Sequence, residues 1–428
     1  MPPLAGTLVV ALLLPLPMLT LAPVAAAVPS VGTANNGFVL ISAALVLLMT
    51  PALAFFYAGF VRGRNVLNTL MMSFGSLALV SVVWVVVGYS LAFSPGHGPL
   101  APFIGGLGWA GLVNWSTPVT DGGPSHGAVA LFQLTFAVIT PALISGAVVE
   151  RMAFRAWMLF VLLWSFVVYI PVAHMVWAPG GFLGTSGGLG ALDFAGGYPV
   201  EMASGLAAAV AAVVVGPRRG HPAQIAPPHN VPLIVLGAGL LWFGWLGFNG
   251  GSGLVAGELA SLACLTTNSA GAAALVWMLI ETQQRGKPTA VGVATGAVAG
   301  LVAITPAAGF VTPMAALAIG ALAALACSQA LQLKGRLHLD DSLDVLPVHG
   351  LAGLLGVLLT GVFHGGPGQL WLQLQAAAFT ALWVVVGTYV VLRLVALVEP
   401  LRVHPDEERQ GLDVNAHGEE AYNNEFTG

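Results

Sequence analysis

The sequence predicts an all-helical (all-α) membrane protein that crosses the bilayer many times. Hydrophobic residues make up 57% of its 428 residues, and the mean hydropathy is +0.90. Charged residues make up only 7%, whereas a soluble domain carries about a quarter. This composition excludes an ordinary soluble enzyme. It also excludes a disordered chain, which needs low hydrophobicity and high charge. The backbone groups of so apolar a chain must pair with one another inside a bilayer.

Apolar stretches set the predicted number of crossings. A helix needs about 20 apolar residues to span a bilayer, and the chain contains eleven candidate stretches. A short break at Thr305–Pro306 separates the eighth from the ninth. The predicted spans are 37–60, 68–93, 127–149, 156–178, 199–216, 231–249, 254–280, 290–304, 309–332, 344–363 and 370–398.

The basic residues support this count and predict an orientation. All 13 lie at the end of an odd-numbered span or in the loop that follows one, and the long loops 94–126 and 179–198 contain none. Because Lys and Arg collect in cytoplasmic loops, the first span starts outside and the tail, 400–428, lies in the cytoplasm. The bases are Arg62, Arg64, Arg151, Arg155, Arg218, Arg219, Arg285, Lys287, Lys334, Arg336, Arg393, Arg402 and Arg409.

The first residues form a separate apolar run, 8–27, that ends in three alanines. A small-residue cleavage site after an apolar segment is typical of a signal peptide, so we expect residues 1–27 to be removed. The alternative is a retained twelfth helix. Two prolines inside the run and the lack of a basic flank disfavour it.

Two short patterns occur twice, five spans apart. Ile139-Thr140-Pro141-Ala142 recurs as Ile304-Thr305-Pro306-Ala307, and Pro199-Val200-Glu201 recurs as Pro347-Val348-His349. Five is an odd number, so the second copy enters the membrane from the opposite side. Inverted repeats of this kind place a substrate path at their interface. The membrane domain, 34–399, therefore divides into repeat one (37–216), repeat two (231–363) and an eleventh helix (370–398).

The repeat aligns Glu201 with His349, and we expect the two side chains to meet near the pseudo-twofold axis. Ionisable groups inside a bilayer are costly and usually line a pathway or pair with one another. A purely structural buried pair is the alternative. Asp193 and Asp344 each precede a span, where a carboxylate accepts backbone N–H groups. We therefore interpret both as structural acids at helix starts.

Aromatic residues gather at the outer ends of spans three, four and six. Trp177 ends span four, Phe132 and Phe136 lie one turn apart in span three, and Phe248 precedes Ser252 by four residues. If these residues meet, they form an aromatic cup with one hydroxyl, which suits a cation. From spacing alone, core packing is the simpler interpretation.

At this point the motifs identify a resemblance. The chain resembles the ammonium transporter family (Amt/Mep/Rh), and the Amt branch in particular, over about residues 34 to 424. Six motifs carry the resemblance in order: AFFYAGFVRGRNVL, IPVAHMVW, ALDFAGG, GWLGFNGGS, DDSLDVLPVHG and GLDVNAHGEEAYN. The resemblance implies a homotrimer with 11 helices and one pore per subunit.

The resemblance also assigns roles to residues. It implies ammonium recruitment by Trp177, Phe132, Phe136 and Ser252, a gate of Phe136 and Phe248, and an acid, Asp193, near the recruitment site. A pore-lining histidine pair follows in the family. His349 matches its second member, and Glu201 replaces the first. Acids occur at this position in fungal members of the family, so we still expect transport. The proton chemistry differs, however, because a Glu–His pair titrates as a unit.

The expected function is ammonium transport without enzyme activity. Ammonium would be recruited, deprotonated by desolvation and passed as ammonia along the Glu–His pore. The resemblance implies that the tail docks on the cytoplasmic face, where a PII-type signal protein binds. We expect the cell inner (plasma) membrane as location, and no cofactor, metal or nucleic acid.

Three alternatives remain. A membrane ammonium sensor would use the same site with little flux. An Rh-like channel for ammonia or carbon dioxide is disfavoured by Trp177 and the Amt-type motifs. An intramembrane serine protease is suggested only by Gly184-Thr185-Ser186-Gly187-Gly188, which lacks the preceding strand of a nucleophile elbow.

Overall fold

A computed structural model describes residues 31–223 and 226–422 of the chain. Within these residues the structure is helical, and pairing between extended segments is limited to two isolated bridges. The predicted signal peptide, residues 1–27, lies outside the described residues.

The first half of the chain contains five helical runs. The runs are α2 (Thr33–Phe60), then η1 (Gly63–Asn65), α3 (Val66–Val83), η2 (Trp84–Gly88) and α4 (Tyr89–Phe93) in succession, then α5 (His126–Val148), then α6 (Phe154–Trp164), η5 (Ser165–Tyr169) and α7 (Ile170–Trp177), and last η6 (Gly197–Met202) with α8 (Ala203–Val215). Two short turns, η3 (Gly98–Leu100) and η4 (Ala110–Leu112), lie in the long loop before α5.

The second half repeats this sequence of long helices and adds a tail. Its elements are α9 (Val231–Gly251), α10 (Glu258–Ala270), α11 (Ala272–Arg285), α12 (Ala290–Ile304), α13 (Pro313–Leu337), η7 (Leu346–Leu351), α14 (Ala352–Thr360), η8 (Gly361–Gly365), α15 (Gly366–Ala396), α16 (Pro405–Gln410) and α17 (Leu412–His417).

Nine helical runs of the described residues are long and apolar enough to cross a membrane. The last, Leu346–Ala396, is a continuous run of 51 residues that contains both α14 and α15, and α12 is apolar but shorter. Each of the eleven predicted stretches overlaps one helical run or part of one. Their borders differ by a few residues, as in the seventh, which was predicted at 254–280 and runs from Glu258 to Arg285. The number of crossings stays a prediction.

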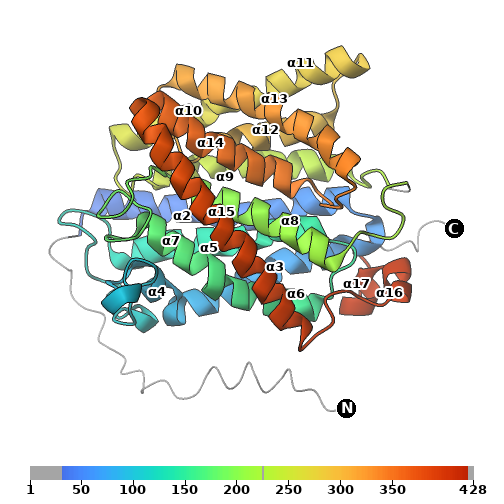
Figure 1. The fold of residues 1–428 in the computed structure, drawn as a ribbon, viewed down its shortest axis with the longest axis horizontal. Coiled ribbons are helices and arrows are strands. Elements are labelled where there is room, and N and C mark those ends of the chain that lie inside the picture. The colour runs from blue at the N-terminus through green and yellow to red at the C-terminus, as the bar shows by residue number, and fades with distance from the viewer. Residues whose placement is uncertain (1–30, 224–225, 423–428) are drawn as a thin grey trace.

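The two halves of the chain lie side by side, and α15 runs diagonally across both of them (Figure 1). Glycines allow the closest contacts between the halves. A Cβ atom on Gly237 of α9 would lie 2.5 Å from the backbone nitrogen of Phe56 in α2. A Cβ atom on Gly205 of α8 would overlap the backbone of Gly350 in η7. Such small residues are what closely packed membrane helices require.

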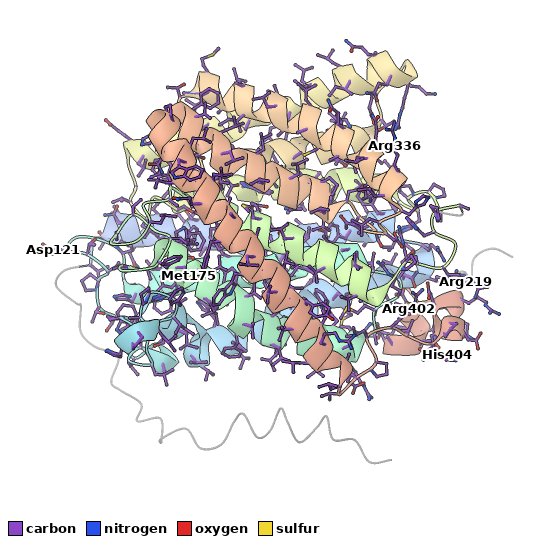
Figure 2. The ribbon with its side chains drawn as sticks, viewed as in Figure 1. Asp121, Met175, Arg219, Arg336, Arg402 and His404 are labelled. Carbon is purple, nitrogen blue, oxygen red and sulfur yellow. The ribbon has the colours of Figure 1, made fainter. Side chains whose placement is uncertain are left out.

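The two ends of the helix bundle differ in charge. Arg219, Arg336 and Arg402 lie at one end together with His404, and Asp121 lies at the other (Figure 2). The helices α16 and α17 pack at the basic end (Figure 1), which we call the tail face. The end that carries the loops 94–125 and 178–196 we call the vestibule face.

Buried charges join loops from both halves at the tail face. The guanidinium of Arg151 is fully buried and donates hydrogen bonds to the carbonyl oxygens of Gly216 and Asp340 and to the hydroxyl of Ser342, at 2.6–2.7 Å. Burial lowers the pKa of Arg151 to about 10, so the group remains charged at neutral pH. Arg218 forms a two-pronged ion pair with the carboxylate of Asp340, whose shortest N···O distance is 2.8 Å. This network connects the loops that follow α5, α8 and α13.

Candidate functional site

A cavity of about 450 Å³ opens at the vestibule face. Residues from α4, α5 and α7, from the loops 94–125 and 178–196, and from the turn after α9 line it, so it forms where several helix ends meet. Its wall combines aromatic rings with a few polar side chains. The aromatic residues are Tyr89, Phe93, Trp109, Trp177 and Phe194, and the polar residues besides Tyr89 and Trp177 are His126, Gln133 and Ser252.

Ser252 and Trp177 both line this cavity, as the expected cup requires. The Ser252 hydroxyl donates a hydrogen bond to the carbonyl oxygen of Phe248 at 2.8 Å. Its oxygen therefore keeps lone pairs that can accept a hydrogen bond from a ligand. The indole nitrogen of Trp177 donates to the carbonyl oxygen of Asp193 at 3.3 Å, which fixes the ring at the end of α7.

Three phenylalanines pack beneath the cavity. The rings of Phe136 and Phe248 lie 4.1 Å apart at 40°, and Phe136 also contacts Trp177 edge-on at 6.1 Å. Phe132 meets Phe136 at 4.8 Å. All three rings are buried. The pair Phe136–Phe248 therefore lies between the cavity and the interior, where a gate was expected.

Phe132 and Phe136 differ from the expectation for the cup, because both are buried and neither lines the cavity. The ring of Phe132 packs against the backbone of Gly251, where an added Cβ would lie 2.7 Å from it. Phe132 is absent from the wall because of its position on α5: its ring is directed toward α9, where it packs against Gly251 and against the ring of Phe136.

Below the phenylalanines, Glu201 and His349 meet as the repeat predicts. The Nδ1 atom of His349 lies 2.8 Å from Oε2 of Glu201, and the two residues are 4% and 1% exposed. Each residue lies in a π-helical turn at the start of its helix, η6 and η7. A Cβ on Gly353 would lie 2.7 Å from the Cβ of Glu201. Glycines at this crossing thus bring the two side chains into contact.

The pair borders a second, narrow cavity of about 10 Å³, which is close to the space that one water molecule needs. Apart from Glu201 and His349, its lining is apolar. The lining includes Leu53, Ile139, Leu143, Trp245, Phe248 and Val298. Phe248 therefore faces this cavity from above, and the aromatic stack separates two cavities that differ in polarity and size.

Asp193 occupies the helix-start position that the sequence predicts. Its carboxylate accepts hydrogen bonds from the backbone N–H groups of Gly196, Gly197 and Tyr198 at 2.7–2.8 Å. Burial raises the pKa of Asp193 to about 6, against the opposing effect of these three bonds. The carboxylate holds the loop that carries Phe194 and orders the start of η6.

Asp344 differs from the expected helix-start role. Its backbone has a positive φ of 62°, and its carboxylate pairs with Lys334. Asp341, three residues earlier, accepts the hydrogen bond from the backbone N–H of Leu346 at 2.7 Å. The carboxylate of Asp344 is thus engaged by Lys334, and Asp341 caps the helix start in its place.

Sequence reasoning missed three polar residues of the cavity at the vestibule face. Oε1 of Gln133 is buried without a hydrogen-bond partner. The hydroxyl of Tyr89 lies 2.8 Å from Nδ1 of His126. Gln133 could have been found as a lone amide inside an apolar span next to Phe132. Tyr89 and His126 could not, because their contact depends on how the 94–125 loop folds.

The arrangement can hold a small cation at an aromatic wall, then restrict passage, then offer one titratable pair in an apolar channel. Comparison with known proteins identifies the family of the chain. The sequence profile of the Ammonium Transporter Family matches residues 37–422.

Curated relatives and solved structures cover most of the chain. The chain is 46% identical to an ammonium transporter of Bacillus subtilis, over 90% of this chain and 97% of that one. It is 45% identical to an ammonium transporter of Aquifex aeolicus, over 91% and 94%. The crystal structure of Saccharomyces cerevisiae Mep2 matches with a TM-score of 0.81 at 34% identity, covering 87% and 90%. A structure titled "Sensor Amt Protein" matches with a TM-score of 0.82 at 28% identity, covering 90% and 98%. The chain therefore belongs to the ammonium transporter family, a family of membrane transporters and not of enzymes.

Proposed function

We propose that this protein conducts ammonium across the cell's plasma membrane as ammonia and a proton, along the path from the outer cavity past Glu201 and His349. One observation carries the proposal. A polar-aromatic cavity, a stacked phenylalanine pair and a narrow apolar cavity with one Glu–His pair follow one another in that order.

The outer cavity recruits the cation. A cation is attracted to the face of Trp177, which lines the cavity, by the quadrupole of the ring. The free lone pairs of Ser252 accept a hydrogen bond from ammonium, which potassium cannot donate. Selection between these two ions, which are similar in size and charge, follows from this difference. Phe136 and Phe248 then have to move apart for passage, because their rings lie 4.1 Å apart.

The narrow cavity favours the neutral molecule. Desolvation disfavours the charged form of any group that enters apolar surroundings, so ammonium releases a proton before or as it passes Phe248. Among the described residues that line that cavity, Glu201 and His349 are the titratable side chains. The pair accepts and returns this proton, or it stabilises a positive charge during transfer.

Orientation and assembly belong to the same proposal. The grouping of the basic residues supports eleven crossings, with the vestibule face outside and the tail face in the cytoplasm. The likeness to the family supports a homotrimer with one pore per subunit. It also supports a PII-type signal protein as a partner at the tail face.

A sensor that binds ammonium with little flux is the second candidate. The observation in its favour is the match to the structure titled "Sensor Amt Protein". Both candidates use the outer cavity, and they differ in whether ions pass the aromatic stack.

The deciding experiment measures current from purified protein in liposomes on a solid-supported membrane. We expect a decaying current after an ammonium pulse and none after a potassium pulse. Glu201→Ala should reduce it at least tenfold, whereas Glu258→Ala, an exposed acid at the start of α10, serves as the matched control. If Glu201→Ala leaves current and internal pH change intact, the pair has no transport role. Ammonium binding without flux supports the sensor.

A further inference from the structure

The outer cavity contains one titratable pair that the transport path does not use. The hydroxyl of Tyr89 in α4 lies 2.8 Å from Nδ1 of His126, the first residue of α5. Both side chains line the same cavity as Ser252 and Trp177. We propose that Tyr89 and His126 form a second hydrogen-bonding subsite for ammonium, which works while His126 is neutral and is lost when the ring becomes protonated.

Packing fixes this pair in place. The ring of Tyr89 stacks on Trp109 at 24° with centroids 6.0 Å apart, and Trp109 contacts the His126 ring at 4.5 Å. The backbone nitrogen of His126 donates to the carbonyl oxygen of Thr117 at 2.8 Å. A ring held by Tyr89 and Trp109, on a backbone that is itself hydrogen-bonded, can present one edge to the cavity in a defined orientation.

The pair offers an acceptor in either tautomer of the imidazole. If the Tyr89 hydroxyl donates to Nδ1, the phenolic oxygen keeps its lone pairs. If Nδ1 carries the proton and donates to Tyr89, then Nε2 is the acceptor. Ammonium has four N–H donors, and Ser252 satisfies one of them. The Tyr89–His126 subsite and the unpartnered Oε1 of Gln133 supply further acceptors that favour ammonium over potassium.

Protonation of His126 reverses this effect. An imidazolium donates from both nitrogens and carries a positive charge, so it repels a second cation in the same cavity. No Asp, Glu, Lys or Arg lines the cavity among the described residues. Asp193, next to Phe194 of the wall, has its carboxylate engaged with three backbone N–H groups. Tyr89 and Trp109 are the side chains packed on the ring, and neither is charged at neutral pH. In the lining itself, His126 is the group whose charge changes with pH. Asp193, whose pKa is raised to about 6 by burial, titrates behind the wall in the same range.

This inference deepens the proposed function and rests on it. It predicts that the ammonium concentration giving half-maximal current rises at least about threefold as external pH falls from about 7.5 to about 5, because histidine titrates in this range. Ammonium itself stays protonated throughout. In His126→Gln an amide accepts a hydrogen bond at every pH, so the ratio should fall well below that of the wild type, and Asp193 accounts for the pH dependence that remains. His126→Asn provides a second amide if the first variant folds poorly.

His97→Gln is the matched control, because His97 is an exposed histidine on the same face and lies outside the cavity lining. It should keep the threefold change. If His126→Gln keeps the pH dependence of the wild type, or the wild type has none, the proposal is overturned.

A second readout separates this inference from the proposed function. Ammonium should raise the thermal unfolding midpoint of the purified protein, since a ligand that binds the folded state stabilises it, and potassium should do so less. If that shift depends on pH through His126 while no current is seen, the subsite stands and transport fails. If ammonium causes neither a shift nor a current, both proposals fall.

Discussion

At the scale of single residues, the Glu201–His349 contact depends on both partners. The two side chains are buried and hydrogen-bonded to one another at 2.8 Å. A buried polar group that loses its partner retains the full cost of its desolvation. Removing one side chain should therefore be worse for stability than removing both.

We predict that Glu201→Leu lowers the free energy of unfolding by about 3 kcal/mol, because it leaves His349 unpaired in an apolar channel. The double variant Glu201→Leu/His349→Leu should recover a large part of this loss. The measurement is the thermal unfolding midpoint of the detergent-purified protein across the double-mutant cycle. A double variant whose loss equals the sum of the two single losses would show that the pair is not coupled.

The residue scale also shows what the sequence can predict about the site. The repeat alone predicted that Glu201 and His349 meet, because residues at equivalent positions of two symmetry-related repeats lie close together near the symmetry axis. The helix-start position of Asp193 followed from local rules of capping. The role of Asp344 did not, because its backbone is left-handed, its carboxylate pairs with Lys334, and Asp341 makes the cap. The place of Phe132 behind Phe136, and not in the wall, depends on packing against Gly251.

At the scale of elements, the tail forms two short helices that dock on the start of α3. The backbone N–H of Leu412 donates to the side-chain oxygen of Asn65 at 2.8 Å, and Asn68 donates its backbone N–H to Asp413 at 2.8 Å. Asn65 also donates to the carboxylate of Glu150 at 3.0 Å. A single amide thus connects the tail to the loop between α5 and α6.

We predict that Asn65→Ala releases α17 from the tail face. Losing a buried hydrogen bond and leaving its partner unsatisfied costs about 1–3 kcal/mol, which corresponds to at least a fivefold faster amide exchange in residues 412–417. Hydrogen–deuterium exchange measures this directly. Asn415→Ala is the control, since the Asn415 side chain bonds only within the tail, to the carbonyl oxygen of Gly411. Equal exchange in both variants would mean that the Asn65 bridge does not hold the tail.

The elements themselves were largely predictable, and their interruptions were not. Length and apolarity located each long helix to within a few residues. The break between α10 and α11 at Gly271 was not predicted. A Cβ on Gly271 would overlap the Trp242 ring of another helix, and a contact between helices cannot be read from local sequence. The tail's acids and turn residues do not indicate a stable isolated helix. Its two helices of six residues each are supported by docking contacts that no local pattern reveals.

At the scale of the whole molecule, the proposed pathway lies at the contact between the two halves of the chain, which we call the seam. The seam is narrow where α8 crosses η7, because Gly205 and Gly350 bring the backbones into contact. Glu201 lies one turn before Gly205, and His349 directly precedes Gly350. The spacing of the two halves therefore sets both the width of the narrow cavity and the contact between its titratable side chains.

The role of the seam can be tested by a substitution that adds a single methyl group. In Gly205→Ala the new Cβ would overlap the backbone nitrogen of Gly350, so the two halves must move apart. We expect a loss of about 1–3 kcal/mol in stability, as for other overpacked interiors. We also expect at least a tenfold loss of ammonium current, because Glu201 and His349 separate as well. Thermal unfolding and solid-supported-membrane current measure the two effects.

Gly239→Ala is the matched control in a long helix of the other half. Gly239 lies in α9, and a Cβ there would meet no atom within 4 Å. Alanine favours a helix over glycine by about 1 kcal/mol, so this variant should be at least as stable as the wild type and should keep its current. If Gly205→Ala behaves like Gly239→Ala in both measurements, the seam tolerates widening, and the contact between the halves does not determine the width of the narrow cavity. If stability falls and current survives, the seam holds the fold together, and the Glu201–His349 contact is not required for conduction.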